Sequence, residues 1–286
     1  MQFHFTGARA RRMLAGSMTN LFDLSGELAV VIGAGGVLGG AIASGFAQAG
    51  AKVAIVDFLP DAAEKRARII RDAGGVAEAF QANAVDVASV QSTCGAIEKS
   101  LGAPTVLLNA AGGNDPKTTV TADNPFEKIP LENWHKNFDL NLLGGAFLPC
   151  QVFGPGMVAR GRGSIINIAS VSAHIPLSRV VSYSAAKAAV LSLTRFLARE
   201  WAPRGVRVNS ITPGFFPAGQ NRKLLFHEDG SPNERTKAVW NHTPMGRFGE
   251  PQELVGAALF LASAKASSFV TGADIRVDGG FLAQTI

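Results

Sequence analysis

The chain has 286 residues, of which 47% are hydrophobic and 17% are charged, and its formal net charge is +5. This composition is typical of a globular domain with a sizeable core, and it excludes a disordered chain. The excess positive charge is concentrated in residues 1–17, which hold three arginines and no acid, while the rest of the chain has 24 bases and 22 acids; this near balance argues against nucleic acid as a partner.

Residues 1–19 are expected to form a disordered or loosely attached tail, whose apolar run is too short for a signal peptide. Met1 and Met18 both stand as candidate start residues. No segment has 18 consecutive apolar residues, so we expect no membrane span and no membrane partner. Cys94 and Cys150 lie far apart without metal-ligand spacing, which predicts no metal site and suits a reducing, cytoplasmic compartment.

Short apolar runs alternate with stretches of helical periodicity along the chain. The expected strands are 28–32, 52–56, 77–82, 105–109, 164–170, 206–211 and 273–280. The expected helices are 38–49, 61–75, 89–101, 131–159 (interrupted by Gly144, Gly154 and Pro155), 182–202 and 251–263. Apolar strands separated by helices are typical of a parallel sheet covered on both faces. The predicted fold class is therefore α/β: a single-domain Rossmann fold with a seven-stranded, doubly wound parallel sheet.

No linker or repeat divides residues 20–286, so we expect one domain. One long segment, about 213–250, is rich in glycine, proline, asparagine and charged residues. A loop of that length in a compact domain is usually functional. The segment is predicted to be a substrate lid.

A glycine-rich turn, GAGGVLGG at 33–40, follows the first expected strand and precedes a helix. Glycines let the main chain approach a pyrophosphate, and the helix N-terminus offers free N–H groups. The predicted cofactor-binding residues here are Gly33, Gly35, Gly36, Val37, Leu38 and Gly39. Because a β-branched residue resists positive φ, we expect an ordinary backbone at Val37 and any left-handed conformation at Gly35 or Gly36.

Asp57 ends the second expected strand, where its carboxylate can accept hydrogen bonds from the adenosine ribose and would repel a 2′-phosphate. No arginine stands in the glycine turn or directly after Asp57, so the sequence favours NAD over NADP. Two further segments follow strands and can approach a cofactor, although each alone indicates only a turn. They are Asp86 and Val87, and the run Asn109, Ala110, Ala111 and Gly112.

Tyr183 is the only tyrosine of the chain, and Lys187 follows it by four residues, on the same face of a helix. A phenol with a pKa of ~10 is a poor base at neutral pH, and a nearby ammonium group favours the phenolate. Ser170 ends a strand, where its hydroxyl can hold a substrate oxygen. Asn141 is a polar residue in an apolar helix: either a satisfied core amide or a site for water that passes protons to Lys187.

The chain resembles the short-chain dehydrogenases/reductases over about 20–286, in the glycine turn, Asp57, NAAG at 109–112, Asn141, Ser170, YSAAK at 183–187 and PG at 213–214. The resemblance implies hydride transfer to or from a nicotinamide. Tyr183 would be the general acid/base, while Lys187 lowers its pKa and binds the nicotinamide ribose. Ser170 would orient the substrate, and Asn141 would complete a proton relay. Pro213 and Gly214 would flank the nicotinamide, and Tyr183 and Phe216 would also contact the cofactor.

Local segments resemble a narrower branch, the short-chain-type D-mannonate oxidoreductases (fructuronate reductases), which implies a six-carbon sugar acid as substrate. Its carboxylate needs a cation, for which Arg222 and Arg179 are candidates. The residues expected to bind substrate are Asn114, Ser170, Ser172, His174, Gln220, Asn221 and Arg222. The chain has Ala218-Gly219 where the branch is expected to have Leu-Thr, which removes a hydroxyl near the cofactor amide.

Two other functions remain open at this point. One is another sugar or polyol dehydrogenase of the same family, of the gluconate 5-dehydrogenase type. The other is a nucleotide-binding protein with a silent active site, against which the presence of Ser170, Tyr183 and Lys187 argues. The family resemblance also implies a homotetramer or homodimer, paired through the helices at 131–159 and 182–202 and through the C-terminal segment.

Overall fold

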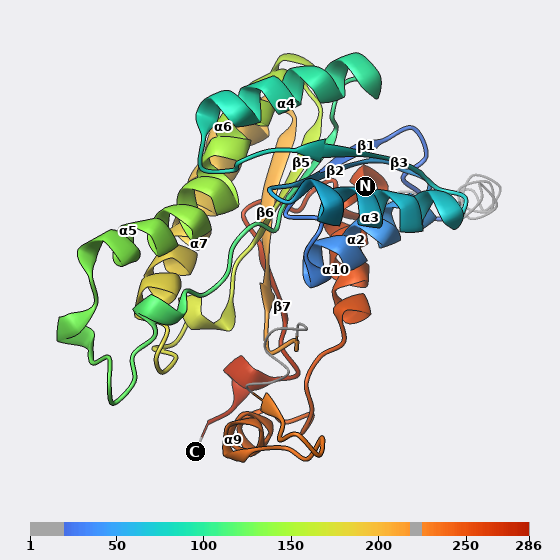
Figure 1. Cartoon of the computed structure of the whole chain (residues 1–286). Coiled ribbons are helices and arrows are strands. Elements are labelled where there is room, and N and C mark those ends of the chain that lie inside the picture. The colour runs from blue at the N-terminus through green and yellow to red at the C-terminus, as the bar shows by residue number, and fades with distance from the viewer. Residues whose placement is uncertain (1–19, 218–224, 286) are drawn as a thin grey trace, which may run out of the picture.

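Seven parallel strands form one sheet in the order β3-β2-β1-β4-β5-β6-β7 (Figure 1). The computed structural model describes residues 20–217 and 225–285, so the predicted tail at 1–19 lies outside the described residues. The strands are β1 (Leu28–Ile32), β2 (Lys52–Asp57), β3 (Val76–Gln81), β4 (Val106–Asn109), β5 (Gly163–Ile168), β6 (Val206–Pro213) and β7 (Asp274–Val277). The predicted α/β class and seven-stranded parallel sheet are confirmed.

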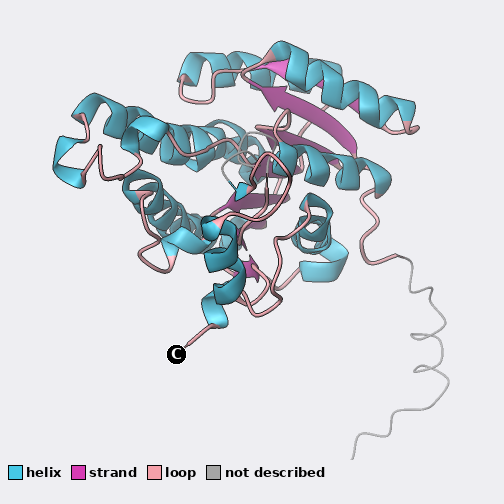
Figure 2. Ribbon diagram, turned by 60° about the horizontal axis from the view of Figure 1, so that its bottom comes forward, coloured by secondary structure: helices cyan, strands magenta, loops and turns pink. Residues whose placement is uncertain are grey.

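Helices cover both faces of this sheet (Figures 1 and 2). One face carries α2 (Val37–Gln48), α3 (Pro60–Asp72) and α10 (Val255–Ala262). The other face carries α4 (Val87–Ser100), α5 (Leu131–Asp139), α6 (Leu148–Ala159) and α7 (Val181–Trp201). The other helices in the part of the chain that the structure describes are α9 (Glu234–His242) and α11 (Ala264–Ser267), with short 3₁₀ turns at Pro116–Thr118, Phe126–Lys128, Val171–Ala173, Ala202–Arg204, Pro251–Leu254 and Phe281–Ala283.

The central strands are apolar because helices cover both of their sides. All five residues of β1 are buried. Side chains alternate between the two faces of a strand, so β1 contributes to two separate cores. Phe46 of α2 anchors the core on one face, and Met157 of α6 anchors the core on the other. Burying side chains of this size stabilises the fold by roughly 1.5–3 kcal/mol each.

The chain changes direction across the sheet at β1, which pairs with β2 on one side and β4 on the other. Ile32, the last residue of β1, lies beside Val56 and Asn109 in the register. Such a switch in strand order leaves a crevice at the carboxyl ends of the strands, where ligands bind in doubly wound sheets. The fold therefore brings the glycine turn and the NAAG segment together at this edge.

The expected helix at 131–159 is continuous, but its middle, Leu140–Phe147, is π-helical. The glycines expected to interrupt it serve close packing instead: a Cβ on Gly154 would lie 2.4 Å from the Trp201 ring. By length and composition Leu131–Ala159 could cross a membrane, with a mean hydropathy of 1.4. A core helix of a globular domain has the same composition, and here α6 packs on the sheet through Met157 and Phe153.

The predicted lid at 213–250 is not a loop throughout. Its residues 218–224 lie outside the described residues, and helix α9 follows them, with the Asn233 side chain accepting a hydrogen bond from the Thr236 N–H at 3.1 Å. The strand expected at 206–211 extends to Pro213 because it pairs with β7. The strand expected at 164–170 ends at Ile168, because Ser170 begins a 3₁₀ turn as its cap.

Candidate active site

The turn between β1 and α2 takes its left-handed residue at Gly33, with φ of +80°. The expectation of Gly35 or Gly36 is therefore wrong: Gly36 has φ of −69° and caps α2. Val37 begins α2 with an ordinary helical backbone, as expected. The physical reason lies at the end of β1, where the Gly33 N–H donates to the Val56 carbonyl at 2.8 Å. The chain must turn directly after this bond.

Glycines open the crevice between the turns after β1 and β4. A Cβ on Gly33 would lie 2.6 Å from the Ala111 nitrogen, and one on Gly39 would lie 3.2 Å from the Ala110 Cβ. Gly112 has φ of +147°, and a Cβ there would lie 2.5 Å from Oδ1 of Asn141. A side chain at Gly33 or Gly39 would collide with main chain, and one at Gly112 would displace the Asn141 side chain. The cradle is therefore bare backbone of the kind a pyrophosphate requires.

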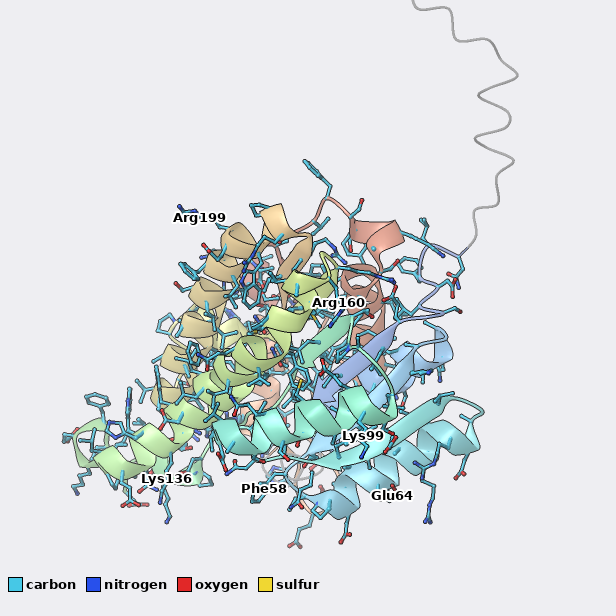
Figure 3. All side chains as sticks on the ribbon, turned by 90° about the horizontal axis from the view of Figure 1, so that it is seen from above. Phe58, Glu64, Lys99, Lys136, Arg160 and Arg199 are labelled. Atoms are coloured by element: carbon cyan, nitrogen blue, oxygen red, sulfur yellow. The ribbon has the colours of Figure 1, made fainter. Side chains whose placement is uncertain are left out.

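Asp57 lies at the end of β2 and faces the glycine turn. Its Oδ2 accepts a hydrogen bond from the Gly35 N–H at 2.9 Å, and its Oδ1 accepts one from the Leu59 N–H at 3.0 Å. The carboxylate is therefore fixed beside the turn. The side chain of Phe58, next in sequence, projects into solvent and is 62% exposed (Figure 3).

The side chains of two other predicted cofactor residues, Asp86 and Asn109, form hydrogen bonds within the protein. Asp86 caps α4 by accepting from the Ala88 N–H at 3.0 Å, and the side chain of Val87 beside it is 42% exposed. The Asn109 side chain is buried away from the crevice and donates to Oδ1 of Asn167 at 2.8 Å. Asn109 can therefore meet a cofactor only through its main chain.

The end of β6 presents Pro213 and Gly214 to the same edge of the sheet. The Gly214 N–H donates to the Val277 carbonyl at 2.9 Å, and a Cβ on Gly214 would lie 2.7 Å from the Asp278 Cα. Phe216 packs against Gly249, where an added Cβ would lie 2.4 Å from its ring. These contacts tie the start of the lid to the segment that leads into α10.

Tyr183 and Ser170 come together at the carboxyl edge of the sheet. Ser170 follows β5, and Tyr183 lies in the first turn of α7. Burial raises the pKa of the Tyr183 phenol, and its hydrogen bond with the Ser170 hydroxyl opposes that rise. The Ser170 Oγ also accepts from the Ser172 hydroxyl at 3.1 Å. Two serines thus line the position beside the phenol.

Lys187 is buried beneath Tyr183, with only 3% of its surface exposed. Its Nζ donates to the Ile168 carbonyl at 2.8 Å and lies 5.7 Å from the centre of the Tyr183 ring. Burial lowers the pKa of Lys187 from 10.5 to about 8. Burial of the phenol outweighs its hydrogen bond with Ser170, so the pKa of Tyr183 lies above its ordinary value, opposite to the expected lowering.

Asn141 lies in the π-helical segment and holds the loop after β4. Its Nδ2 donates to the Gly113 carbonyl at 2.8 Å, and its Oδ1 accepts from the Gly113 N–H at 3.0 Å. The Lys187 Nζ and Asn141 Oδ1 both lie beside Gly112. Two interpretations of Asn141 were open from the sequence, a satisfied core amide or a member of a proton relay. In the structure its amide is fully hydrogen-bonded and also lies near Lys187.

The predicted substrate residues divide into those near Ser170 and those elsewhere. Ser172 is buried beside Ser170, and His174 lies two residues further, with its Nε2 3.2 Å from Oδ2 of Asp274. The Asn114 side chain turns away to donate to the Thr119 hydroxyl at 2.7 Å. Gln220, Asn221 and Arg222, with the preceding Ala218-Gly219, lie outside the described residues.

Sequence reasoning missed two residues that the structure brings to this edge. Asp274 is an acid in β7, and nothing in its local sequence indicates that it faces His174, 100 residues earlier. Arg235, in the first turn of α9, lies close enough to Arg179 for repulsion between the two cations to contribute, after burial, to a lowered Arg235 pKa. In the sequence, the one indication of a role for Arg235 is its position two residues after Asn233, the residue that caps α9 in the lid.

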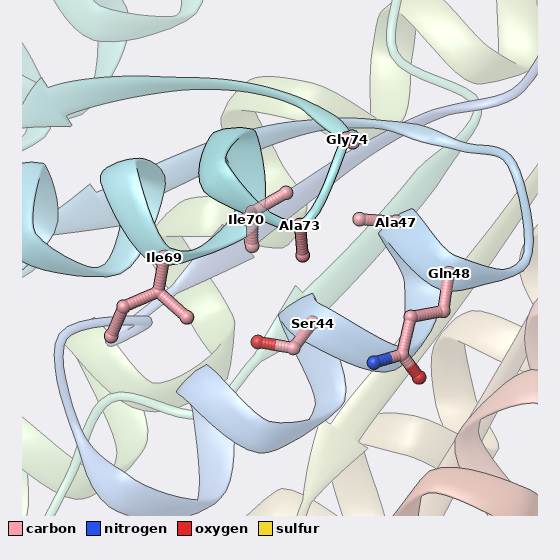
Figure 4. Close-up of a pocket in the computed structure, with 8 residues that line it drawn as sticks. Ser44, Ala47, Gln48, Ile69, Ile70, Ala73 and Gly74 are labelled. Carbon is pink, nitrogen blue, oxygen red and sulfur yellow. The ribbon is translucent and has the colours of Figure 1, made fainter.

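Two surface cavities lie away from this constellation. One, of about 250 Å³, lies between the C-terminal ends of α2 and α3 (Figure 4). The other, of about 580 Å³, is lined by residues at the amino edge of the sheet, such as Thr105 and Gly163. Helices that cross back over a parallel sheet run opposite to its strands, so both cavities are at the edge remote from Tyr183 and are not the reaction site.

A family model described as enoyl-(acyl carrier protein) reductase matches residues 33–282. The chain is 37% identical to D-threitol dehydrogenase of Mycolicibacterium smegmatis, over 91% of this chain and 94% of the relative. A Haemophilus influenzae structure with bound NAD, whose D-mannonate oxidoreductase activity is inferred, has a TM-score of 0.87 at 38% identity, covering 92% and 97%. A gluconate 5-dehydrogenase from Burkholderia cenocepacia J2315, with NADP and tartrate, has a TM-score of 0.83 at 34% identity, covering 93% and 99%.

The chain belongs to the short-chain dehydrogenase/reductase family. It is an oxidoreductase that acts on CH–OH groups of sugar-like alcohols with a nicotinamide cofactor. The residues present fit that cofactor, because the bare cradle at Gly33, Gly39 and Gly112 would be filled by any side chain.

Replacement of Gly33 by alanine should lower the free energy of unfolding by more than about 2 kcal/mol, since it combines positive φ with a clash against main chain. The matched control is Gly95→Ala inside α4, where an added Cβ meets nothing within 4 Å; it should be neutral or stabilising by about 0.5–1 kcal/mol. Urea unfolding measures both. Equal effects of the two substitutions would contradict the assignment of strain to Gly33.

The buried ammonium of Lys187 should weaken the fold. Its pKa is about 8 when folded, against an ordinary 10.5, so the penalty is full below pH 8 and declines as the pH rises toward 10.5. This shift corresponds to at most about 3 kcal/mol. Replacing Lys187 by methionine should therefore stabilise the protein at pH 7 by roughly 1–2 kcal/mol, because the orphaned Ile168 carbonyl offsets part of the gain, and should abolish activity.

Urea unfolding at pH 7 and pH 10 tests this expectation, with Lys99→Met on the exposed side of α4 as the control (Figure 3). The stabilisation should shrink at pH 10 for Lys187→Met and stay near zero for the control. A Lys187→Met variant that is less stable than the parent at pH 7 would show that the lysine is held by attractions stronger than its burial.

Proposed function

We propose that the protein is an NAD(H)-dependent oxidoreductase that interconverts a secondary alcohol and a ketone on a sugar acid, namely D-mannonate and D-fructuronate. The observation that carries the reaction is the arrangement of Tyr183, Ser170 and buried Lys187 at the carboxyl edge of the sheet. The similarity to the NAD-bound Haemophilus influenzae structure supports the choice of substrate.

A bound nicotinamide supplies the hydride acceptor or donor. In the oxidative direction, the Tyr183 oxygen takes the proton of the substrate hydroxyl; in the reductive direction, it gives a proton to the developing alkoxide. Ser170 donates a hydrogen bond to the same substrate oxygen and so stabilises the charge that develops there. Lys187 carries a cation below the phenol, and its lowered pKa, about 8, lets it exchange a proton near neutral pH.

Asp57 supports NAD over NADP. Its Oδ2 accepts from the Gly35 N–H of the glycine turn and its Oδ1 from the Leu59 N–H just after β2, so a negative charge is fixed at the position that a ribose 2′-oxygen approaches. A 2′-phosphate would meet this charge directly. The related structures bind either NAD or NADP, so the local carboxylate is the observation that favours NAD.

Two arginines support a substrate with a carboxylate. Arg179 precedes α7 with φ of +74°, the one left-handed non-glycine residue in the part of the chain that the structure describes, and its carbonyl accepts from the Val120 N–H at 2.8 Å. Arg235 in the lid is its electrostatic neighbour. Within 20–217 and 225–285, neither guanidinium forms an ion pair. Two such cations can clamp an anion.

The second candidate is a dehydrogenase of the gluconate 5-dehydrogenase type. It is favoured by the similarity to the Burkholderia cenocepacia enzyme, whose structure holds tartrate, itself a hydroxylated acid. Both candidates use the same catalytic residues and react at C5 of the acid, and their substrates differ in the configuration at C2. A nucleotide-binding protein without catalysis is the remote alternative, and the satisfied contacts of Ser170 and Lys187 argue against it.

We also propose that the protein forms a homotetramer or homodimer in the cytoplasm. Leu140, Phe147 and Phe196 are large apolar side chains with 39%, 39% and 58% of their surface exposed. They lie on the π-helical segment and on α7, which pack against each other, so a second copy could cover them together. Light scattering should give the mass of two or four chains, and a monomer mass would contradict the proposal.

Reduction of D-fructuronate by NADH should be faster than reduction of 5-ketogluconate, and faster than either reaction with NADPH. Initial rates on a panel of sugar acids and polyols measure this. Replacing Tyr183 by phenylalanine should lower kcat by about 10²–10⁴-fold, because the proton donor is lost. NADH affinity should change little, and Ser184→Ala, which removes a neighbouring hydroxyl that donates to the Val180 carbonyl, should be near parental.

The outcomes of this panel separate the candidates. Turnover of 5-ketogluconate without turnover of D-fructuronate selects the second candidate. A Tyr183→Phe variant with parental turnover would remove Tyr183 from the mechanism, and binding of NADH without turnover of any substrate would leave the nucleotide-binding protein.

Replacing Arg235 by alanine should raise KM for a sugar acid by about tenfold or more, since a charge-assisted hydrogen bond is worth roughly 1.5–3 kcal/mol. KM for a neutral polyol such as D-threitol should stay within about twofold. Arg199→Ala, at the far end of α7, is the control for loss of an exposed arginine (Figure 3). An equal rise in KM for the acid and the polyol would show that Arg235 shapes the lid and does not bind the carboxylate.

A further inference from the structure

A partly buried acid on β7, Asp274, gathers three side chains at the carboxyl edge of the sheet. Oδ1 of Asp274 accepts from the Ser210 hydroxyl at 2.6 Å and from the Thr212 hydroxyl at 2.8 Å. Its Oδ2 lies 3.2 Å from Nε2 of His174. The His174 and Asp274 side chains are only 16% and 14% exposed, so solvent competes little for these bonds.

The partners of the carboxylate decide how the His174 ring is protonated. An ionised carboxylate only accepts hydrogen bonds, and the Thr212 hydroxyl, which donates to Asp274, can only accept in its other direction. Nε2 lies 3.2 Å from the Thr212 Oγ1 as well. Both neighbours of Nε2 are therefore acceptors, so Nε2 carries the proton. In the neutral ring Nδ1 is then an acceptor, with its tautomer fixed by the acid behind it.

The ring is held beside both halves of the reaction site. His174 ends the 3₁₀ turn that Ser170 begins, and its N–H donates to the Val171 carbonyl at 3.1 Å. Its partner Thr212 directly precedes Pro213 at the end of β6. The imidazole thus spans from the serine turn, which holds the reacting oxygen, to the strand end that leads into the lid.

We propose that His174 is a specificity-determining residue whose Nδ1 accepts a hydrogen bond from a substrate hydroxyl next to the reacting carbon, with Asp274 as the positioning residue that orients the ring. The inference rests on the proposed function only in taking the substrate to be polyhydroxylated. It selects against alcohols that lack this hydroxyl, because an acceptor desolvated by the substrate would be left without a donor.

Two matched substitutions separate the roles of the ring nitrogens. His174→Asn keeps a polar atom near the position of Nδ1 and loses the one at Nε2. His174→Gln keeps a donor near the position of Nε2, facing Asp274, and loses the Nδ1 acceptor. Asp274→Asn keeps the volume of the acid and removes its charge. The same change on the exposed side of α5, His135→Gln, is the control.

The readout is kcat/KM for the best hydroxylated substrate of the panel, divided by kcat/KM for its analogue that lacks the hydroxyl next to the reacting carbon. We expect this ratio to fall about tenfold in His174→Gln, the factor that one hydrogen bond carries, and less in His174→Asn. The fall should appear mainly in KM. Asp274→Asn should lower the ratio with His174 present and have no further effect on it in His174→Gln.

A ratio unchanged in His174→Gln, with kcat/KM lowered equally for both substrates, would overturn the proposal and leave His174 as a structural tie between the serine turn and β7. Thermal unfolding and NADH affinity, measured for each variant, identify loss of folding. Because the test uses whichever acid or polyol of the panel is the best substrate, failure of D-fructuronate as a substrate overturns the proposed function without affecting this test.

Discussion

The candidate site depends on a cation held inside the protein. The Lys187 ammonium is buried under Tyr183 and is stabilised by a carbonyl at the end of β5. That carbonyl is free to accept because the strand ends there and the chain turns into the loop of Ser170. The end of β5 therefore supplies the hydrogen-bond acceptor for Lys187 and leads into the 3₁₀ turn that Ser170 caps. Helix α7 places Tyr183 beside both. Shifting α7 along the sheet would break all three relations together.

Much of the fold could be predicted from local pattern. Runs such as LAVVI are uniformly apolar because the sheet is covered on both faces, and this is visible in a single sequence. Tyr183, Lys187 and Ser170 were also predictable, since helical spacing and position at a strand end are local properties. The left-handed residue of the glycine turn was not predictable: it depends on where the Gly33 N–H finds the Val56 carbonyl of a neighbouring strand.

Long-range electrostatics explains the other differences. Asp274 and His174 are far apart in sequence, and the pairing of β5 with β6 and of β6 with β7 brings them together. The direction of the tyrosine pKa also could not be read from YSAAK. The spacing places Lys187 on the same helix face as Tyr183. The pKa of the phenol, however, depends on how deeply it is buried and on the acceptor of the lysine's hydrogen bond, which is the Ile168 carbonyl. Contacts within one helix or strand can be predicted from the spacing of residues, whereas the burial of a side chain depends on how the elements pack together.

The π-helical segment Leu140–Phe147 has a consequence for how one long helix is used. A π turn takes more residues than an α turn, so the side chains before it and after it are out of phase along the same axis. Before the segment, Asn137 turns toward the loop after β4, donating to the Gly113 carbonyl at 2.9 Å. After it, Phe153 and Met157 turn toward the sheet. One continuous helix can thus direct amide side chains to the loop after β4 and apolar side chains to the core. Deleting one residue from the π-helical segment would change the phase between its two halves, so that both sets of contacts could not form at once.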